Sequence, residues 1–171
     1  MIYYTYIPTP IGKILFAKKD GRPYKVLLPG REAAPVPDQS WKEDDQNTAP
    51  EAGEIAAYFK GETRTFSCTA IPEGTPFYRR IWSAALQIPY GQTVSYEDVA
   101  RAAGNPKACR AAGAALGANP LPIIIPCHRV IGKSGKLVGF SSGLDIKTYL
   151  LNLERYHISP ASLSSSSHSF R

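Results

Sequence analysis

The chain has 171 residues, a formal net charge of +6, and a composition of 43% hydrophobic and 20% charged residues, which is typical of a globular protein with one domain or two small ones. It contains no run of roughly eighteen apolar residues that could span a membrane. Its N-terminal residues alternate polar and aromatic side chains and lack the basic flank and apolar core of a signal peptide. We therefore expect an intracellular, cytoplasmic protein.

The positive charge is unevenly distributed along the sequence. Residues 1–74 contain nine Lys and Arg against ten Asp and Glu, whereas residues 75–171 contain eleven against four. A polyanion should therefore bind the second half of the chain. Charge alone leaves open that this basic surface serves only solubility.

The cysteines and histidines argue against disulfides and against a metal site. Cys68, Cys109 and Cys127 are an odd number without a C-x-x-C pair, a pattern that suits a reducing compartment. Cys127 and His128 are sequence neighbours rather than ligands spaced to close on one ion. We expect no metal and no cofactor.

The first half of the chain predicts a small α/β unit. Alternating residues bounded by turn residues predict an antiparallel sheet with strands at 2–7, 11–18 and 23–29. A polar, Pro-rich loop at 30–50 precedes a helix at 50–59, and a further strand is predicted at 65–68. No residue here carries obvious chemistry, and the tyrosines are expected in the core or on the sheet surface.

The second half opens with a predicted helix over 76–88. A capping box that starts at Ser95 predicts the next helix over 95–103. Residues 104–106, Gly-Asn-Pro, then supply a C-cap, an N-cap and the first residue of a helix over 106–117. Two helices joined by so tight a turn predict a helix-turn-helix, although many such pairs bind nothing.

The second helix of this pair is rich in alanine and glycine, with Lys107 and Arg110 as its main long side chains. A helix that reads bases in the major groove needs several long polar side chains, whereas small residues let a helix lie close in the minor groove, where little sequence is read. This composition favours sequence-tolerant DNA binding. The alternative is that the alanines permit tight helix packing.

The apolar residues 123–125 predict a buried strand that ends at Pro126 and leads into Cys127. Free cysteines are often inert and buried. Here, however, Pro126 fixes the chain, His128 offers a base beside the sulfur, and Arg129 adds positive charge that favours the thiolate. A reactive thiol held on rigid structure is the preferred interpretation.

The remaining residues predict a short strand at 130–131 and a hairpin turn at 132–135. A return strand at 137–140 and a flexible loop at 141–143 are predicted to follow. A last helix over 145–156 carries Glu154, which taken alone would be a surface charge. Residues 157–171 are rich in serine and are expected to form a mobile tail.

Residues 126–130, Pro-Cys-His-Arg-Val, resemble the active-site signature of the O6-alkylguanine-DNA alkyltransferases, also called methylated-DNA-protein-cysteine methyltransferases. The ordered matches run from about Gly74 to Glu154 and include Ile88-Pro89-Tyr90-Gly91, Ser95-Tyr96, Asn105-Pro106-Lys107-Ala108, Arg110-Ala111, Ala118-Asn119-Pro120 and Gly143-Leu144. The resemblance implies a ribonuclease H-like α/β domain at 1–72 and a mostly α winged helix-turn-helix domain at 73–156.

By this resemblance, Cys127 is the nucleophile, His128 takes its proton, directly or through water, and Glu154 orients and charges the imidazole. Tyr96 helps to rotate the damaged nucleotide and hydrogen-bonds the flipped guanine, with a buried structural tyrosine as the alternative. Asn119 ties the turn beside the nucleophile.

The same resemblance implies a set of contacts with DNA. Arg110 fills the gap left by the flipped nucleotide, with an ordinary phosphate contact as the alternative. Phe140 forms a ring wall where many relatives have tyrosine, the Ser141 N–H faces the guanine O6, and the carbonyls of Cys127 and Val130 accept from its exocyclic amine. The other expected contact residues are Lys107, Ala111, Ala114 and Pro122.

The implied function is direct repair of double-stranded DNA. The alkyl group of O6-alkylguanine, and of O4-alkylthymine, moves to Cys127 after minor-groove binding and base flipping, and the monomeric protein acts once because water does not hydrolyse a thioether. Two alternatives are a non-catalytic alkylated-DNA-binding protein or helix-turn-helix regulator, and a Cys-His-Glu hydrolase of acyl substrates, which would need an oxyanion hole.

Overall fold

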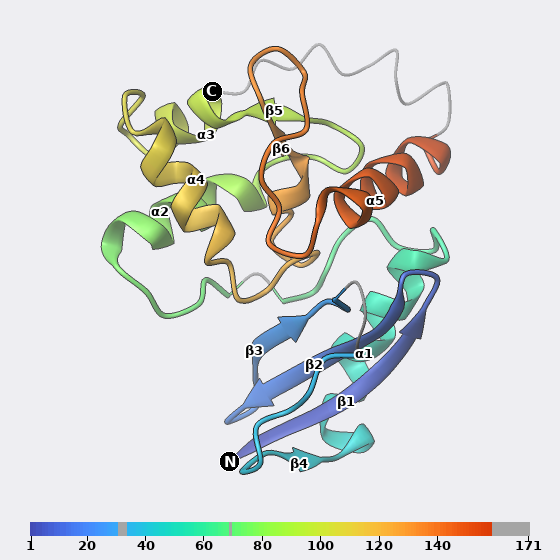
Figure 1. Cartoon of the computed structure of the whole chain (residues 1–171). Coiled ribbons are helices and arrows are strands. Elements are labelled where there is room, and N and C mark those ends of the chain that lie inside the picture. Colours follow the sequence, from blue (N-terminus) through green and yellow to red (C-terminus); the bar gives the residue numbers. More distant parts are fainter. Residues whose placement is uncertain (31–33, 69, 159–171) are drawn as a thin grey trace.

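The computed structural model describes residues 1–30, 34–68 and 70–158. Figure 1 shows a sheet with one helix in its lower part and a group of helices above them. The predicted mobile tail, residues 157–171, lies almost entirely outside the described residues. The fold class is the predicted one, an α/β unit followed by a mostly helical unit.

The sheet has the strand order β3-β2-β1-β4. Its strands are β1 (Ile2–Thr9), β2 (Gly12–Lys19), β3 (Arg22–Leu27) and β4 (Lys42–Glu43). The three predicted strands are confirmed and pair antiparallel, and Asp20 and Gly21 form the β2–β3 turn with φ of 50° and 78°. β4 pairs parallel with β1, so the sheet is mixed rather than antiparallel as predicted.

Helix α1 (Asp45–Phe59) begins five residues before the predicted start at Pro50, which lies inside the helix. Asp44 caps the helix, since its side chain accepts from the Asn47 N–H at 2.9 Å. A local cap therefore outweighs the single intrahelical hydrogen bond that Pro50 cannot make. The predicted strand at 65–68 is wrong: these residues form bends and irregular backbone, and the fourth strand of the sheet is β4.

The second half contains α2 (Pro76–Leu86), α3 (Tyr96–Ala102), α4 (Cys109–Gly117) and α5 (Leu144–Tyr156). The capping box of α3 is confirmed, with Ser95 Oγ accepting from the Asp98 N–H and Asp98 accepting from the Ser95 N–H. The helix-turn-helix turn is longer than predicted, because residues 105–108 form a turn closed by the Ala108 N–H and the Asn105 carbonyl, and α4 starts at Cys109 without a side-chain cap.

The stretch before the thiol is a buried tight turn rather than the predicted strand. Ile123 has a φ of 76°, and the Ile125 N–H donates to the Leu121 carbonyl at 2.8 Å. All of residues 121–130 are buried, so the apolar run reflects burial and not strand pairing. The expected rigid support of Cys127 is thus provided by a turn.

Beyond the thiol, β6 (Val130–Ile131) is the predicted short strand and pairs parallel with β5 (Val94–Ser95). The turn at 132–135 is confirmed by the hydrogen bond from the Gly135 N–H to the Gly132 carbonyl. Residues 137–140 form no return strand and run instead as an irregular loop. This loop lies over the thiol, as described below.

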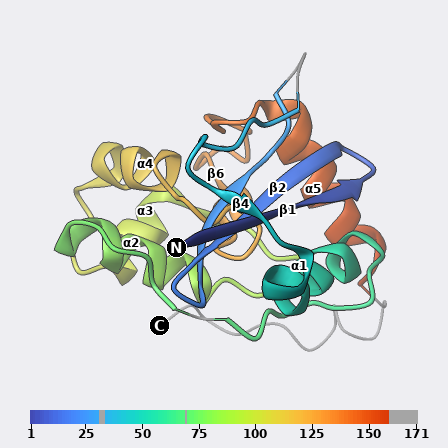
Figure 2. The same cartoon turned by 90° about the horizontal axis from the view of Figure 1, so that it is seen from below.

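The two halves share one hydrophobic core, drawn from the sheet, from α1 and from all four later helices. In Figure 2, which views the molecule from below, the sheet and α1 lie across the helical half. The Val26 N–H of β3 donates to the Pro120 carbonyl at 2.8 Å, and the Tyr58 hydroxyl of α1 donates to Glu154 of α5 at 2.8 Å. The second of these bonds connects α1 to Glu154, which belongs to the candidate active site described below.

Substituting Ser95→Ala should lower the free energy of unfolding by about 1 kcal/mol, because α3 loses its side-chain cap. Urea denaturation followed by circular dichroism measures this. The matched control is Ser83→Ala, at an exposed position inside α2, which should leave stability within about 0.5 kcal/mol of the original. Equal effects of both substitutions would contradict the capping role.

Candidate active site

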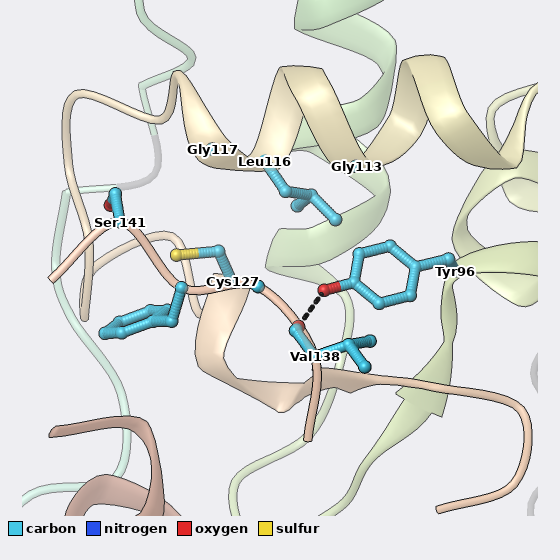
Figure 3. Close-up of a pocket in the computed structure, with 9 residues that line it drawn as sticks. Tyr96, Gly113, Leu116, Gly117, Cys127, Val138 and Ser141 are labelled. Atoms are coloured by element: carbon cyan, nitrogen blue, oxygen red, sulfur yellow. Dashed lines mark hydrogen bonds between the residues drawn. The ribbon is translucent and has the colours of Figure 1, made fainter. Parts of the chain in front are cut away.

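A cavity of about 450 Å³ lies between α4 and the loop after β6. It is lined by Tyr96, Gly113, Leu116, Gly117, Cys127, Val138, Gly139, Phe140 and Ser141. Figure 3 shows the Cys127 sulfur between α4 and the 138–141 loop, with the Tyr96 ring on the side of Val138. Of the residues predicted from sequence, the fold thus brings Cys127, Tyr96, Phe140 and Ser141 to one cavity.

Cys127 begins the short 3-10 helix η1 (Cys127–Arg129) and is only 8% exposed. Its N–H donates to the Ile125 carbonyl at 2.7 Å, which closes the turn before it. Asn119 braces the same turn: its Nδ2 donates to the Ile125 carbonyl at 2.9 Å and its Oδ1 accepts from the Leu121 N–H at 3.0 Å. Asn119 therefore has the turn-tying contacts expected for it.

Behind the thiol lies a fully buried carboxylate, Glu154, on α5. Its Oε1 faces His128 Nε2 at 2.6 Å and accepts from the Tyr58 hydroxyl at 2.8 Å and from Arg129 Nη2 at 3.0 Å. Its Oε2 accepts from Arg129 Nε at 2.9 Å and from the Gly91 N–H at 2.8 Å. Both oxygens are saturated with donors, which is how a buried charge is tolerated.

Burial alone would raise the pKa of Glu154, but the hydrogen bonds that it accepts from His128 and Arg129, together with the positive charge of the Arg129 guanidinium, lower that pKa to about 2. Burial lowers the pKa of His128, against the opposing pull of Glu154. Arg129 is then the cation that balances Glu154, and His128 is a neutral imidazole that donates Nε2–H to the carboxylate. Its buried Nδ1 has no hydrogen-bond partner among the described residues and is free to accept a proton.

Burial raises the pKa of the Cys127 thiol, and the Asn119 side chain and the Lys147 ammonium partly offset this. Cys127 is therefore a thiol at neutral pH and needs a base before it can act as a nucleophile. The expectation that Arg129 favours the thiolate is wrong, because its guanidinium is paired with Glu154. Lys147 provides the nearby positive charge instead.

Lys147 was missed from the sequence. Its side chain is fully buried, and its Nζ donates to the carbonyls of Val130 at 2.6 Å, Val138 at 3.3 Å and Gly139 at 3.4 Å. It thus ties the loop over the cavity to β6. Lys147 lies seven residues before Glu154, on the inward face of α5, and this helical spacing could have identified it.

The Tyr96 hydroxyl donates to the Val138 carbonyl at 2.7 Å, the dashed line in Figure 3. Burial, together with the nearby Cys127 sulfur, raises the pKa of Tyr96, so the phenol stays protonated. The Val130 carbonyl, expected to accept from a guanine amine, already accepts from Lys147. A second lone pair remains on that oxygen, and its predicted role stays a prediction.

The alanines of helix α4 differ in burial. Ala112 and Ala115 are fully buried, and the Ala115 carbonyl accepts from Trp82 Nε1 of α2 at 2.8 Å. Ala111 and Ala114 are exposed. One face of α4 therefore packs tightly, and another is a smooth surface.

The remaining predicted contact residues divide by exposure. Arg110 and Lys107 are exposed, beside the smooth surface of α4 and in the turn before it. Pro122 is buried in the turn that leads to Cys127, so it does not lie on the outer surface with them.

Within the part of the chain that the structure describes, no three His, Cys, Asp or Glu side chains gather in a way that could hold a metal ion. No helix in that part is long and apolar enough to cross a membrane.

The fold and the site define a protein in which a helix-turn-helix half carries a cysteine beside a His–Glu pair. Residues 2–72 match the family model described as 6-O-methylguanine DNA methyltransferase, ribonuclease-like domain, and residues 76–156 match that of its DNA binding domain. The chain belongs to the 6-O-methylguanine DNA methyltransferase family.

Individual relatives agree with this assignment. Methylated-DNA-protein-cysteine methyltransferase of Methanosarcina acetivorans is 46% identical over 154 residues, which span 90% of this chain and 98% of that protein. The constitutive enzyme of that name from Bacillus subtilis is 42% identical, over 91% of this chain and 96% of its own length.

Solved structures are similar over nearly the whole chain. The crystal structure of Mycobacterium tuberculosis O6-methylguanine methyltransferase is 38% identical, with a TM-score of 0.83 over 96% of this chain and 100% of that chain. The structure of the M. tuberculosis OGT protein in complex with DNA is 39% identical, with a TM-score of 0.82 over 95% and 98% of the two chains.

The free energy of unfolding should fall as the pH is lowered. The pKa of Glu154 is about 2 in the folded protein against an ordinary value of 4.5, so its stabilisation, about 3 kcal/mol, is present above pH 4.5 and is lost as the pH falls toward 2. The lowered pKa of His128 acts in the same direction below its ordinary value of 6.5. Denaturant titrations at a series of pH values measure this dependence.

The variant Glu154→Gln is the control for this pH dependence. It should be less stable at neutral pH by about 3–5 kcal/mol, because Arg129 is left as a buried unpaired charge, and it should lose the part of the pH dependence below 4.5. A wild-type stability that is flat between pH 6 and 3 would contradict the proposed ionisation of Glu154.

Replacing Lys147→Met keeps the length of the side chain and removes its charge. The pKa of Cys127 should rise further, because the ammonium that lowers it is gone, and alkylation of Cys127 by iodoacetamide at neutral pH should slow several-fold. Peptide mapping separates Cys127 from Cys68 and Cys109. Lys136→Met, at an exposed position, is the matched control, and an unchanged Cys127 rate in Lys147→Met would refute this role.

Proposed function

We propose that this chain repairs double-stranded DNA by transferring the alkyl group of O6-alkylguanine to Cys127 in a single turnover. The observation that carries this proposal is a nearly buried thiol in a 450 Å³ cavity, in the same helical turn as a neutral imidazole held by an ionised carboxylate, in a chain of this family. The relatives named above as methyltransferases support the same reaction.

Proton transfer to His128 starts the reaction. A cysteine with an ordinary pKa of about 8.5 is only a few per cent thiolate near neutrality, and burial reduces this fraction further in Cys127. The unpaired Nδ1 of His128 takes the thiol proton, directly or through a water molecule, while Nε2–H remains bonded to Glu154. The resulting imidazolium is stabilised by the carboxylate.

The thiolate then displaces guanine from the alkyl carbon. A sulfur–carbon bond forms, the bond between that carbon and O6 breaks, and its electron pair remains on the guanine, which is reprotonated. Tyr96 is the phenol at the cavity wall that can donate to the departing base, provided that its hydroxyl leaves the Val138 carbonyl. Ser141 and Phe140 are proposed to hold the base from the loop side.

The base must leave the stack to react. Cys127 is 8% exposed and lies inside the cavity, so it cannot reach an alkyl group within a duplex. Extrusion of a damaged nucleotide costs a few kcal/mol, and the cavity volume lies in the range of ordinary ligand pockets. Asn119 keeps the turn that carries the sulfur in place for this reaction.

The exposed face of α4 is the proposed DNA surface. Its Ala111 and Ala114 present little bulk to the minor groove, Lys107 is suited to phosphate, and Arg110 is long enough to fill the gap left by the extruded base. The excess of basic residues in the second half supports this orientation. O4-alkylthymine is a second proposed substrate, and the cytoplasm is the proposed compartment.

Incubation with a duplex that carries O6-methylguanine, followed by intact-mass measurement and peptide mapping, tests this proposal. The protein should gain one methyl group, on Cys127, and the reaction should stop at one equivalent because the thioether is stable. Cys127→Ala should bind the duplex without a gain in mass. Tight binding by the original protein with no mass change would instead indicate a non-catalytic damage-binding protein.

A further inference from the structure

One polar side chain of the N-terminal half reaches the active-site network. Tyr58, on α1, is fully buried, although it lies 70 residues before His128 and 96 before Glu154 in the sequence. It does not line the cavity of Cys127. Tyr58 therefore lies beside His128 and Glu154, which together form the proton relay, and not beside the bound substrate.

The Tyr58 hydroxyl and His128 Nε2 meet at the same oxygen of Glu154. The distances to Oε1 are 2.8 Å from the hydroxyl and 2.6 Å from Nε2, and the hydroxyl lies 3.4 Å from Nε2. Burial and the nearby Glu154 charge raise the pKa of Tyr58 well above 10, so the phenol stays protonated and donates a hydrogen bond to the carboxylate. The hydroxyl and the imidazole thus fix Oε1 from two directions.

The Tyr58 ring is held in place independently of its hydroxyl. Its neighbours are Phe59, Phe66, Tyr90 and His128, with ring centroids 5.4, 5.9, 6.0 and 6.5 Å away. Phenylalanine at this position would keep these packing contacts. The contribution of the hydroxyl can therefore be separated from that of the ring.

We propose that Tyr58 is a positioning residue for the alkyl transfer, through a hydrogen bond that holds Glu154 Oε1 where it orients His128. This inference rests on the proposed function and extends it, because it makes the N-terminal half a contributor to the relay. Glu154 aligned in this way keeps His128 protonated at Nε2 and leaves Nδ1 bare for the Cys127 proton.

The expected effect of removing the hydroxyl follows from the groups that surround His128. Glu154 and Lys147 face it from α5, Arg129 and Cys127 lie in its own helical turn, and Tyr58 approaches from α1. Tyr90, in the segment after α2, packs against Tyr58 and Arg129 rather than against His128. With one donor fewer, Glu154 holds the Nε2 proton more strongly and favours the charged imidazolium. His128 should then become protonated at a higher pH, and a protonated imidazole cannot serve as the base.

The test is the pH dependence of single-turnover methyl transfer by Tyr58→Phe. At saturating duplex with O6-methylguanine and neutral pH, the transfer rate constant should fall about three- to tenfold, the effect expected for the loss of one hydrogen bond of typical net strength. The acid limb of the rate profile should move to higher pH. The dissociation constant for the duplex, measured with the additional Cys127→Ala substitution, should not change, because Tyr58 is outside the cavity.

Tyr90→Phe is the matched control. The Tyr90 hydroxyl is buried, has no hydrogen-bond partner among the described residues, and belongs to a ring packed against Tyr58. This variant removes a hydroxyl from the same interface without touching Glu154. Its rate profile should follow that of the original protein.

An unchanged rate profile in Tyr58→Phe, or an equal shift in Tyr90→Phe, would overturn the positioning role while methyl transfer by the original protein still supported the proposed function. Absence of transfer in the original protein would refute the proposed function itself. If Tyr58→Phe does not fold at the assay temperature, proton NMR of the original protein gives the answer. A slowly exchanging Tyr58 hydroxyl proton close to the His128 ring is expected, and its absence would refute the inference.

Discussion

The site depends on the need to satisfy one buried carboxylate. Removing Glu154 from water costs several kcal/mol, which is recovered only when its oxygens accept well-placed hydrogen bonds. The donors come from η1, from the segment after α2 and from α1. Since α1 belongs to the N-terminal half, the relay is complete only when the two halves are packed together, and the shared hydrophobic core holds them so.

This arrangement assigns separate tasks to charges that lie close together. Arg129 compensates Glu154, and His128 can therefore remain neutral and act as a base beside a thiol that is itself protonated. Lys147 holds the loop over the cavity and lowers the pKa of the sulfur. A buried thiol that is deprotonated only on demand is also protected from oxidation and from chance electrophiles.

Features set by neighbouring residues could be predicted from the sequence, and features set by distant ones could not. The Ser95 cap and the Asp20-Gly21 turn follow from local chemistry, and the signature around Cys127 identified the nucleophile candidate. The expected strand at 123–125 failed because an apolar run reports burial without naming a pairing partner, and the strand expected at 65–68 failed because alternation over four residues is also compatible with an unpaired, partly exposed segment. Tyr58 was missed because its partner lies on a distant element. The spacing of Lys147 from Glu154 indicates a shared face of α5, but the carbonyls that Lys147 binds lie on other segments and could not be predicted.

The central claim is that His128 is a neutral imidazole with its proton on Nε2 and a free Nδ1. Nitrogen-15 NMR of the histidine rings at pH 7, with His128 assigned by substitution, measures this tautomer directly. We predict that Nε2 has the chemical shift of a protonated nitrogen that is hydrogen-bonded to the carboxylate, and that Nδ1 has the chemical shift of an unprotonated nitrogen. An imidazolium, or a proton on Nδ1, would contradict the account, because neither form can take the Cys127 proton at Nδ1.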